Sequence, residues 1–268
     1  MTDAPLGTAL ITGASAGIGA TYADRLARRG YDLVIVARSL ERLETLAATL
    51  RAETGRTIDV VVADLTDGDD LDRIVKLLAS NEAITVFVNN AGAALKGGIL
   101  DNEAPAFEKL IALNVTATTV LASAAAKAFK ARGTGSIINI ASVLALAPEL
   151  FDGTYSATKA FNLHLSRSLS TLLADAGVYV QAVLPGATRT EIWEKSGVPA
   201  DALPADMVMD VDDLVDAALV GFDRRETITI PPLADDGQWA AFDQARGALL
   251  PNLSRSAVAP RYLQAVEA

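Results

Sequence analysis

Tyr155, Lys159 and Ser142 have the side chains and the spacing for acid–base chemistry at an oxygen atom. Tyr155 and Lys159 are four residues apart, which places them on one face of a helix. A phenol with its ordinary pKa of about 10 is a weak acid–base catalyst at neutral pH, and a nearby ammonium group favours its ionised form. Ser142 precedes Tyr155 by 13 residues and could hydrogen-bond a substrate oxygen that gains negative charge. Because a Tyr-x-x-x-Lys pair is common on helix surfaces, other motifs must support this interpretation.

Asn114 is a polar residue within an otherwise apolar helical pattern, between Leu113 and Val115. Burying an amide without hydrogen-bond partners costs free energy, so its presence there needs a reason. We expect Asn114 to hold a water molecule that links Lys159 to solvent.

A glycine-rich turn follows the first apolar strand pattern and opens a helical pattern. Its functional candidates are Gly13, Ser15, Gly17, Ile18 and Gly19, in the spacing G-x-x-x-G-x-G. Glycines here let the backbone approach a pyrophosphate closely, and the N–H groups of the helix start complete an anion site. A tight turn with close helix packing would use the same residues without a ligand. Together with the catalytic pattern, the motif favours a dinucleotide site.

The end of the second strand pattern indicates which dinucleotide binds. NAD sites usually carry Asp or Glu here for the ribose 2′-hydroxyl, whereas an Arg accommodates the 2′-phosphate of NADP. Ala37 occupies the acidic position and Arg38 follows it, so NADP(H) is the expected cofactor, with NAD(H) as the alternative. Ser15 and Ser39 are candidate phosphate donors. Arg38 could instead pair with Glu41 or be solvated.

Two more groups of candidate residues lie where strand patterns end. Asp64 and Leu65 follow the third strand pattern, and the Asp64 carboxylate could accept from an adenine amine or cap the next helix. Asn90, Ala91 and Gly92 follow the fourth, where small residues let a ring lie close to the backbone, although a generic turn also uses Asn and Gly. Open α/β sheets bind ligands at this carboxyl edge, so both groups are expected at the cofactor.

Alternating strand and helix patterns must position these residues. Strands are expected at residues 8–12, 32–37, 57–63, 84–89, 136–141, 178–184 and 227–230, and helices at 18–29, 39–54, 71–79, 104–130 and 155–176. This order predicts the α/β class, with a Rossmann-type, doubly wound, seven-stranded and mainly parallel sheet that has helices on both faces. We expect one domain over residues 1–268, with a substrate lid at about 187–210, where Gly and Pro interrupt the pattern.

Composition limits the partners. The 268 residues carry a formal net charge of −10, and binding to nucleic-acid phosphates requires clustered Lys and Arg, so we expect no nucleic-acid partner. No apolar run approaches the roughly 20 residues that span a bilayer, so we expect no membrane interaction. The first residues do not resemble a signal peptide, which predicts a cytoplasmic location. The chain has no cysteine, which excludes thiolate metal sites, and we expect no metal.

In their chain order these motifs resemble the single-domain branch of the short-chain dehydrogenase/reductase family, over about residues 8–190. The family's nucleotide motif matches residues 12–19, and its Asn-Asn-Ala-Gly motif matches residues 89–92. Its catalytic tetrad matches Asn114, Ser142, Tyr155 and Lys159. Its segment beside the nicotinamide carboxamide matches Pro185, Gly186, Thr188 and Thr190.

The resemblance implies a role for each tetrad residue. Tyr155 would exchange a proton with the carbonyl or alcohol oxygen, and Ser142 would orient the substrate. Lys159 would bind the nicotinamide ribose and lower the pKa of Tyr155, so both residues also belong to the cofactor site. Asn114 would position a relay water. The cofactor itself would supply the hydride chemistry.

The expected function is therefore NADP(H)-dependent interconversion of a carbonyl and an alcohol on a small molecule. Leu144, Leu146, Leu150 and Phe151 suggest an apolar pocket wall, so the expected substrate is a hydrophobic ketone, aldehyde or secondary alcohol. The alternative is a non-catalytic dinucleotide-binding sensor or interaction protein on the same fold. A lyase or epimerase is a third hypothesis, which the short segment after Pro185 disfavours.

A homodimer or homotetramer is expected through helices 104–130 and 155–176, which carry more apolar residues than one buried face requires. The family's tetramer-building ending, similar to Val-Asp-Gly-Gly, is replaced here by residues 227–232, which supports the dimer over the tetramer. Trp193 and Trp239 are interpreted as packing residues of the lid and tail ahead of pocket residues, and the single histidine, His164, has no assigned role.

Overall fold

The computed structural model describes residues 6–192 and 202–263 of the chain. Its contacts divide the chain into two compact units, which we call the body (Met1–Pro232) and the tail (Leu233–Ala268). The body holds the sheet and the candidate site, and the tail holds one helix with short helical turns. The expectation of a single domain over residues 1–268 stays a prediction.

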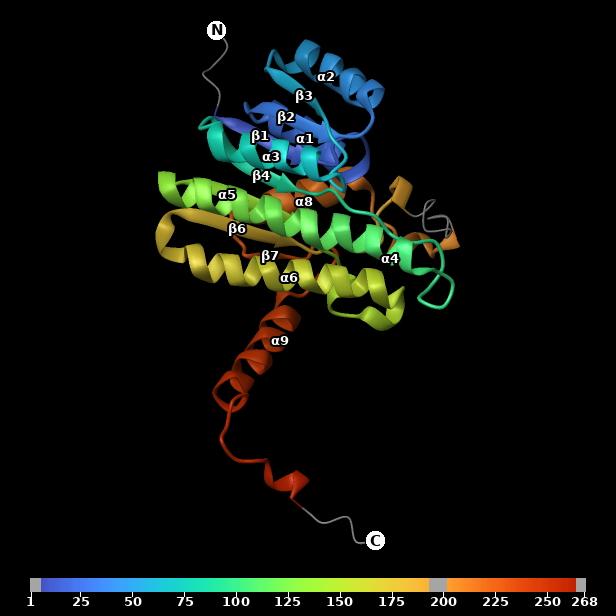
Figure 1. The fold of residues 1–268 in the computed structure, drawn as a ribbon, viewed down its shortest axis with the longest axis vertical. Helices are drawn as coiled ribbons and strands as arrows, with labels where there is room; N and C mark the ends of the chain where they lie inside the picture. Colours follow the sequence, from blue (N-terminus) through green and yellow to red (C-terminus); the bar gives the residue numbers. More distant parts are fainter. Residues whose placement is uncertain (1–5, 193–201, 264–268) are drawn as a thin grey trace. The chain divides into compact units, whose positions relative to one another are not determined.

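The described strands form one seven-stranded sheet in the order β3-β2-β1-β4-β5-β6-β7, and every neighbouring pair is parallel (Figure 1). The strands are β1 Thr8–Thr12, β2 Asp32–Ala37, β3 Ile58–Val62, β4 Ile84–Asn89, β5 Gly135–Ile140, β6 Val178–Val183 and β7 Ile228–Thr229. The strand order reverses between β1 and β4, which makes that point of the carboxyl edge the natural ligand crevice. The predicted Rossmann-type fold is confirmed.

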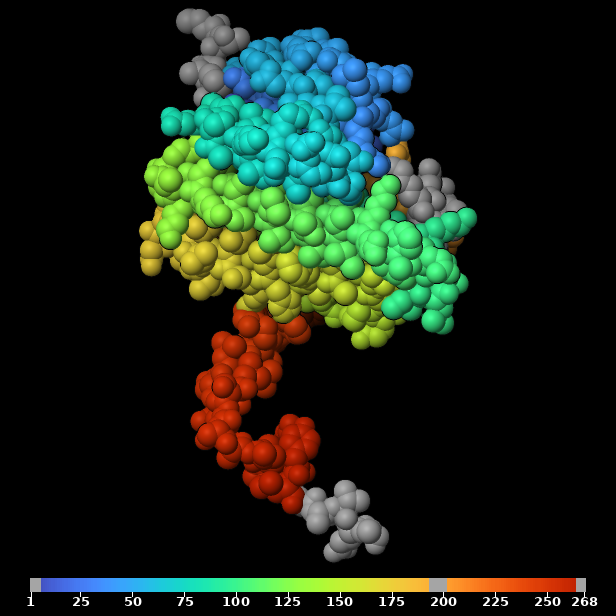
Figure 2. Space-filling model, viewed as in Figure 1, coloured from blue at the N-terminus to red at the C-terminus, as the bar shows by residue number. Residues whose placement is uncertain are grey.

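Helices cover both faces of this sheet. They are α1 Gly17–Arg28, α2 Leu40–Thr54, α3 Gly68–Ser80, α4 Ala104–Ile111, α5 Thr118–Arg132, α6 Gly153–Leu173 and α8 Val211–Asp223. Helix α1 packs between α2 and α8 on one face, whereas α5 packs between α3 and α6 on the other. Figure 2 shows α3 and α5 side by side on the surface of the body.

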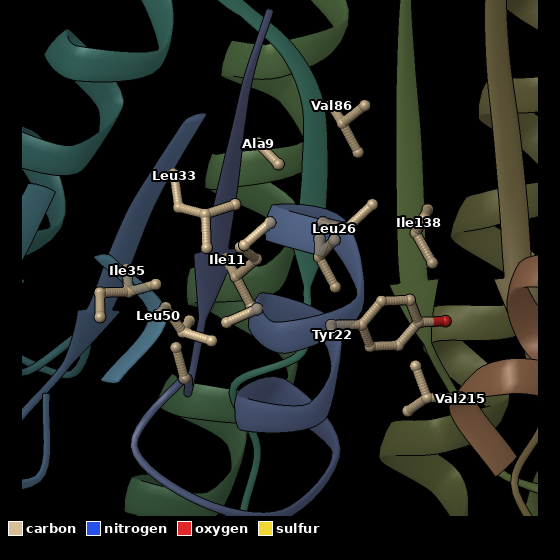
Figure 3. Close-up of a cluster of buried hydrophobic side chains, with 14 of the residues drawn as sticks. Ala9, Ile11, Tyr22, Leu26, Leu33, Ile35, Leu50, Val86, Ile138 and Val215 are labelled. Carbon is tan, nitrogen blue, oxygen red and sulfur yellow. The ribbon is translucent and has the colours of Figure 1, made fainter. Parts of the chain in front are cut away.

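Two hydrophobic clusters lie on opposite faces of the sheet. Ala9 and Ile11 of β1 join the cluster beneath α1, where Tyr22 and Leu26 pack against them (Figure 3). Leu10, between them in the strand, joins the other cluster. Because successive strand side chains point to opposite faces, strands covered on both faces must be apolar throughout. This explains the unbroken apolar runs in the sequence.

The predicted helix 104–130 is interrupted by a π turn at Ala112–Ala117. The hydroxyls of Thr118 and Thr119 donate to the carbonyls of Leu113 and Val115, at 3.5 Å and 2.7 Å, on the same stretch. A π turn adds a residue within a helix and occurs often at functional sites. Sequence periodicity did not indicate it, because one added residue barely disturbs an apolar helical pattern.

Among the described residues, the run Ala104–Arg132 is long and apolar enough to cross a membrane by length and composition. The structure buries 50% of its most apolar window. Leu121, Ala125 and Phe129 of this run belong to the cluster on one face of the sheet. Packing in a protein core therefore accounts for its apolar composition.

The predicted lid at 187–210 is described only in part, because residues 193–201, which include Trp193, lie outside the described residues. At its base, Thr188 forms a bridge with Met209, and the backbone N–H of Met209 donates to the Ala187 carbonyl at 2.9 Å. The start and the end of this segment therefore lie side by side. Helix α8 begins two residues after Met209.

Candidate active site

The candidate residues come from loops at the carboxyl ends of β1, β2, β3, β4, β5 and β6, from the first turns of α1 and α6, and from the π turn that holds Asn114. Parallel strands bring all these ends to one edge of the sheet. Residues that are far apart in the sequence therefore meet at one site.

The glycine turn is built for close backbone packing. Gly13 has a φ of +67°, and a Cβ there would lie 2.8 Å from the Asn90 amide nitrogen and 3.0 Å from Ala91 Cα. A Cβ on Gly19 would lie 2.4 Å from the Gly13 carbonyl oxygen. Gly17 has a φ of +52° and lies against Thr190 from the segment after β6. The structure thus brings together three predicted groups, around residues 13–19, 90–91 and 190.

Thr12 organises this contact, although the sequence analysis gave it no role of its own within the nucleotide motif. Its buried hydroxyl accepts from the backbone N–H groups of Asn90 and Ala91, at 3.0 Å and 3.1 Å, and donates to the Val88 carbonyl at 3.4 Å. The Asn90 side chain donates to the Thr12 carbonyl at 2.9 Å. Asn90 therefore holds the glycine turn and the β4 end together. The available signal was a hydroxyl at the end of an apolar strand.

The start of helix α1 fits an anion. Its N-cap residue, Ala16, provides no side-chain hydrogen bond, and its first turn contains no acidic residue. The leading N–H groups of such a helix are unsatisfied and favour negative charge. Ser15 and Ile18 lie partly buried on either side of this helix start.

Arg38 is exposed at the end of β2 and has no ion-pair partner in the part of the chain that the structure describes. The alternative pairing with Glu41 is therefore not formed. Ser39 caps α2, with its Oγ accepting from Arg42 N–H at 3.4 Å, and Arg42 pairs with Glu191 at 2.7 Å. Arg38 is thus the unpaired cation at this strand end, and its guanidinium group is available to an anionic ligand.

Asp64 does not cap helix α3, because Asp67 does so. One Asp64 oxygen instead accepts from the Thr66 hydroxyl at 2.7 Å and from its N–H at 3.0 Å. These bonds, with Arg38 as a weaker cause, hold the pKa of Asp64 below its usual range. The neighbouring Leu65 is buried in the core. Asp64 remains an ionised acceptor beside Arg38, compatible with the predicted contact to an adenine amine.

Lys159 and Asn114 converge on Gly92. A Cβ on Gly92 would lie 3.4 Å from Asn114 Oδ1 and 3.5 Å from Lys159 Nζ. Lys159 is only 5% exposed, and its Nζ donates to the carbonyl of Ile140 at 3.1 Å. The ammonium lies 5.6 Å from the centre of the Tyr155 ring. Lys159 therefore faces the loop after β4 instead of solvent, with its ammonium group beside the Tyr155 ring.

Asn114 lies on the π turn with its side chain fully engaged. Its Oδ1 accepts from Ala93 N–H at 2.9 Å, and its Nδ2 donates to the Ala93 carbonyl and to Thr158 Oγ1, at 2.9 Å and 3.0 Å. Thr158 in turn donates to the Tyr155 carbonyl at 2.7 Å. Asn114 therefore ties the β4 loop to the Tyr155 turn. Its side-chain amide is occupied by protein groups, and the predicted role in holding water stays a prediction.

Tyr155 is fixed by its own helix start. Asp152 caps α6 by accepting from Tyr155 N–H at 2.9 Å, and the Phe151 ring meets the Tyr155 ring edge to face at 5.9 Å. Burial raises the pKa of Tyr155 above its ordinary value. Lys159 Nζ bonds the Ile140 carbonyl and burial disfavours its charge, so the lowering of the Tyr155 pKa by Lys159 stays a prediction. The phenol therefore holds its proton at neutral pH.

The burial of Lys159 gives a testable pH dependence. Burial lowers the pKa of Lys159 from 10.5 to about 8. Between these values the unfolded chain binds more protons at this group than the folded chain, so its contribution to stability rises with pH. Without added cofactor, we expect the free energy of unfolding to gain about 2 kcal/mol from this group between pH 8 and pH 10.

Lys159→Met is expected to abolish that gain, measured as urea midpoints at the two pH values. Lys76→Met, at an exposed lysine of α3, is the matched control and should keep the wild-type pH slope. Equal slopes in wild type and Lys159→Met would contradict the burial of a titrating Lys159.

Ser142 follows β5 and is 7% exposed. Its Oγ accepts from Leu144 N–H at 3.2 Å and donates to the Pro185 carbonyl at 3.4 Å. The turn Val143–Ala145 that follows packs against α6, the helix of Tyr155. The contact with Pro185 joins the ends of β5 and β6. Because the Ser142 hydrogen bond to the Pro185 carbonyl is long, the Ser142 hydroxyl can turn toward a ligand.

Gly186 and Thr188 continue the segment after Pro185. A Cβ on Gly186 would lie 3.3 Å from Pro232, and the buried Thr188 hydroxyl donates to the Gly186 carbonyl at 3.0 Å. Thr190 donates to the Thr188 carbonyl at 3.3 Å. Residues 185–190, held by these internal hydrogen bonds, run from the end of β6 to the glycine turn. The predicted contact with the nicotinamide carboxamide would lie along this segment.

The short chain dehydrogenase family model matches residues 7–199. The chain belongs to this family, and its Rossmann-type fold agrees with that. The expected resemblance is confirmed.

Particular relatives refine this picture. A short-chain dehydrogenase from Sphingobium yanoikuyae, solved in complex with NADPH, aligns with a TM-score of 0.93 and 52% identity over 96% of this chain and 100% of its own. A bulky-bulky ketone specific alcohol dehydrogenase from Comamonas testosteroni aligns with a TM-score of 0.89 and 49% identity over 97% of this chain and 99% of its own. Human 17-beta-hydroxysteroid dehydrogenase type 3 is 35% identical over 68% of this chain, but the match spans only 59% of that protein.

Proposed function

We propose that this chain is an NADP(H)-dependent oxidoreductase that interconverts a carbonyl and an alcohol on a hydrophobic small molecule. The observation that carries the proposal is the convergence of Lys159 Nζ and the Asn114 side chain on Gly92 at the strand-order reversal, with the Tyr155 ring beside Lys159. The geometry combines a proton-bearing phenol with a buried cation beside a glycine-lined approach. This is an arrangement for chemistry at an oxygen atom.

The residues present fit a dinucleotide. Gly13 and Gly19 let the turn pack closely against the end of β4, and the uncapped start of α1 suits a pyrophosphate. Arg38 suits a 2′-phosphate, and Lys159, which lies beside Gly92, suits a ribose hydroxyl. When bound, the nicotinamide would supply the hydride. One solved relative is an NADPH complex, which supports the choice of NADP(H) over NAD(H).

The state of Tyr155 defines its part in the reaction. Because burial raises its pKa, the phenol keeps its proton at neutral pH and can donate it to a carbonyl oxygen during reduction. Ser142 would hydrogen-bond the same oxygen and hold it within reach. Oxidation of an alcohol needs the phenolate, so it is favoured at higher pH.

The substrate proposed is a bulky apolar ketone or the corresponding secondary alcohol. Leu146 and Leu150, between Ser142 and Tyr155, are 36% and 73% exposed, and Phe151 packs on the catalytic ring. Exposed apolar side chains beside a catalytic phenol suit an apolar ligand. One solved relative is a bulky-bulky ketone specific alcohol dehydrogenase, which supports this substrate class.

A panel of ketones, aldehydes and secondary alcohols with NADPH, NADH and their oxidised forms tests the proposal. We expect the highest kcat/KM for bulky aryl ketones with NADPH. NADPH fluorescence on binding without turnover of any substrate would instead support a dinucleotide sensor. Turnover of a nucleotide sugar would support the lyase or epimerase hypothesis.

Arg38 is expected to set the cofactor preference. Arg38→Ala removes the exposed cation at the β2 end, so the Kd for NADPH should rise about 10-fold to 100-fold, which is the range of a charge-assisted bond. The Kd for NADH should stay within about threefold, since it lacks the 2′-phosphate. Titration of protein fluorescence with each cofactor measures both values.

Arg42→Ala is the matched control, because Arg42 already pairs with Glu191. It should change the two cofactors alike. An unchanged NADPH to NADH ratio in Arg38→Ala would refute the assignment.

We propose a cytoplasmic location. We also propose a homodimer or homotetramer that uses helices α4, α5 and α6. Ile111, Phe161 and Leu172 are 44%, 38% and 65% exposed on α4 and α6. Val75 and Val120 line an apolar hollow between α3 and α5. Such surfaces are typical of subunit contacts.

A further inference from the structure

Residues 185–191, which we call the strap, cross the carboxyl edge of the sheet. The strap begins after the end of β6, and Glu191 at its far end pairs with Arg42 in the first turn of α2, the helix that follows β2. In the sheet β6 and β2 are separated by β5, β4 and β1, so the strap covers four strand spacings, about 19 Å. Seven residues reach at most about 23–25 Å, so the strap crosses this edge in a nearly extended form.

The strap lies against the elements that suit a dinucleotide. A Cβ on Gly17, at the start of α1, would lie 3.1 Å from the Thr190 side chain. At the other end of the strap, the Pro185 carbonyl accepts from the N–H of Val143 at 2.9 Å, next to Ser142. The strap therefore connects the substrate end of the site with the helix start that suits a pyrophosphate.

Backbone hydrogen bonds fix the start and the middle of the strap. Besides the bond at Pro185, Met209 N–H donates to the Ala187 carbonyl at 2.9 Å, and Arg189 N–H donates to the Met209 carbonyl at 3.0 Å. These bonds join the strap to the segment that leads into α8. They leave the connection to α2 to the side chain at the end of the strap.

That connection is an ion pair close to solvent. Arg42 Nη1 donates to both carboxylate oxygens of Glu191, at 2.7 Å and 3.0 Å. The two side chains are 52% and 38% exposed. An exposed ion pair is weak and is screened by salt, so it can open and close without disturbing the core.

We propose that Arg42 and Glu191 form a clasp that retains the bound dinucleotide by holding the end of the strap to α2. The inference rests on the proposed function, because it takes the ligand of the glycine turn to be a dinucleotide. A ligand that extends from this turn to Lys159 has the strap across its length, and opening of the clasp frees the end of the strap. Since the clasp does not use the 2′-phosphate, it should retain NADPH and NADH alike, in contrast to Arg38.

Dissociation rates test the clasp. Stopped-flow fluorescence, with excess oxidised cofactor to displace NADPH or NADH, measures koff for each. Arg42→Ala and Glu191→Gln should each raise both koff values by about twofold to fivefold, the range of an exposed ion pair. The double variant should raise them no further, because both changes remove the same contact.

Glu53→Gln is the matched control. Glu53 lies at the other end of α2 and pairs with Arg28, and these side chains are 46% and 51% exposed. This ion pair is as exposed as the clasp but does not involve the strap, so Glu53→Gln should keep the wild-type koff for both cofactors.

Salt gives a second readout. The koff values of wild type and Arg42→Ala should converge at about 1 M NaCl, where the Debye length is about 3 Å. Additive effects in the double variant, or a rise for NADPH alone in Arg42→Ala, would overturn the clasp, since the latter places Arg42 on the 2′-phosphate. Wild-type rates in both single variants would overturn the clasp alone, whereas a wild type that binds neither cofactor would overturn the proposed function together with it.

Discussion

Tyr155→Phe is expected to lower kcat/KM for ketone reduction by about 10²-fold to 10⁴-fold, the range of a lost general acid. The variant keeps the ring that packs on Phe151 and the backbone N–H that Asp152 caps. The fold and the NADPH affinity should therefore remain, with Kd within about threefold of wild type. Steady-state NADPH oxidation with a bulky aryl ketone measures the effect.

Ser142→Ala is a useful comparison, because it removes a hydrogen bond to the substrate oxygen but leaves the acid in place. It should lose less activity than Tyr155→Phe. A Tyr155→Phe variant within tenfold of wild type would show that the phenol is not the acid.

Lys159→Met is expected to cause the second large loss, about 10²-fold near neutral pH. A unit charge 5.6 Å from the Tyr155 ring interacts with the phenolate by about 3 kcal/mol at an effective dielectric constant of about 20. That energy corresponds to about a hundredfold in rate if it is fully expressed in the transition state. The loss should be greatest for alcohol oxidation, which requires the phenolate.

A pH profile separates this effect from a structural one. In Lys159→Met the alkaline limb that reports Tyr155 should move to higher pH, whereas a merely misfolded variant would lose activity equally at every pH. An unmoved limb would show that Lys159 does not act on Tyr155 through its charge.

Much of the fold follows from local sequence patterns. The expected strands 8–12, 32–37 and 84–89 match β1, β2 and β4 residue for residue, because each is an apolar run between clear turn signals. Each bound expected for the third, fifth, sixth and seventh strands lies within one residue of the observed bound. The sheet is fully parallel, since β7 also pairs parallel with β6.

The candidate site was foreseeable in its chemistry and less so in its supporting contacts. The Tyr155–Lys159 spacing predicted a shared helix face, but it did not predict that Lys159 would be buried against Ile140. The supporting roles of Thr12 and Thr158 were not predicted, because their hydroxyls act through hydrogen bonds to distant backbone and side chains. Such contacts depend on tertiary structure, which residue types and spacing alone do not encode.

One interpretation changed with the structure. Asp64 was offered as a cap of the next helix, and Asp67 takes that place because it directly precedes the first turn of α3. The Asn114 side chain bonds Ala93 and Thr158, and its expected role in holding a relay water stays a prediction.

The most direct test is the stoichiometry of one reaction: NADPH consumed against alcohol formed from a bulky aryl ketone, for wild type and Tyr155→Phe at pH 7. We predict one alcohol per NADPH with the wild type, and NADPH binding without alcohol formation with Tyr155→Phe. Wild-type protein that binds NADPH but forms no alcohol from any ketone, or a Tyr155→Phe variant that forms it at the wild-type rate, would contradict the proposed function.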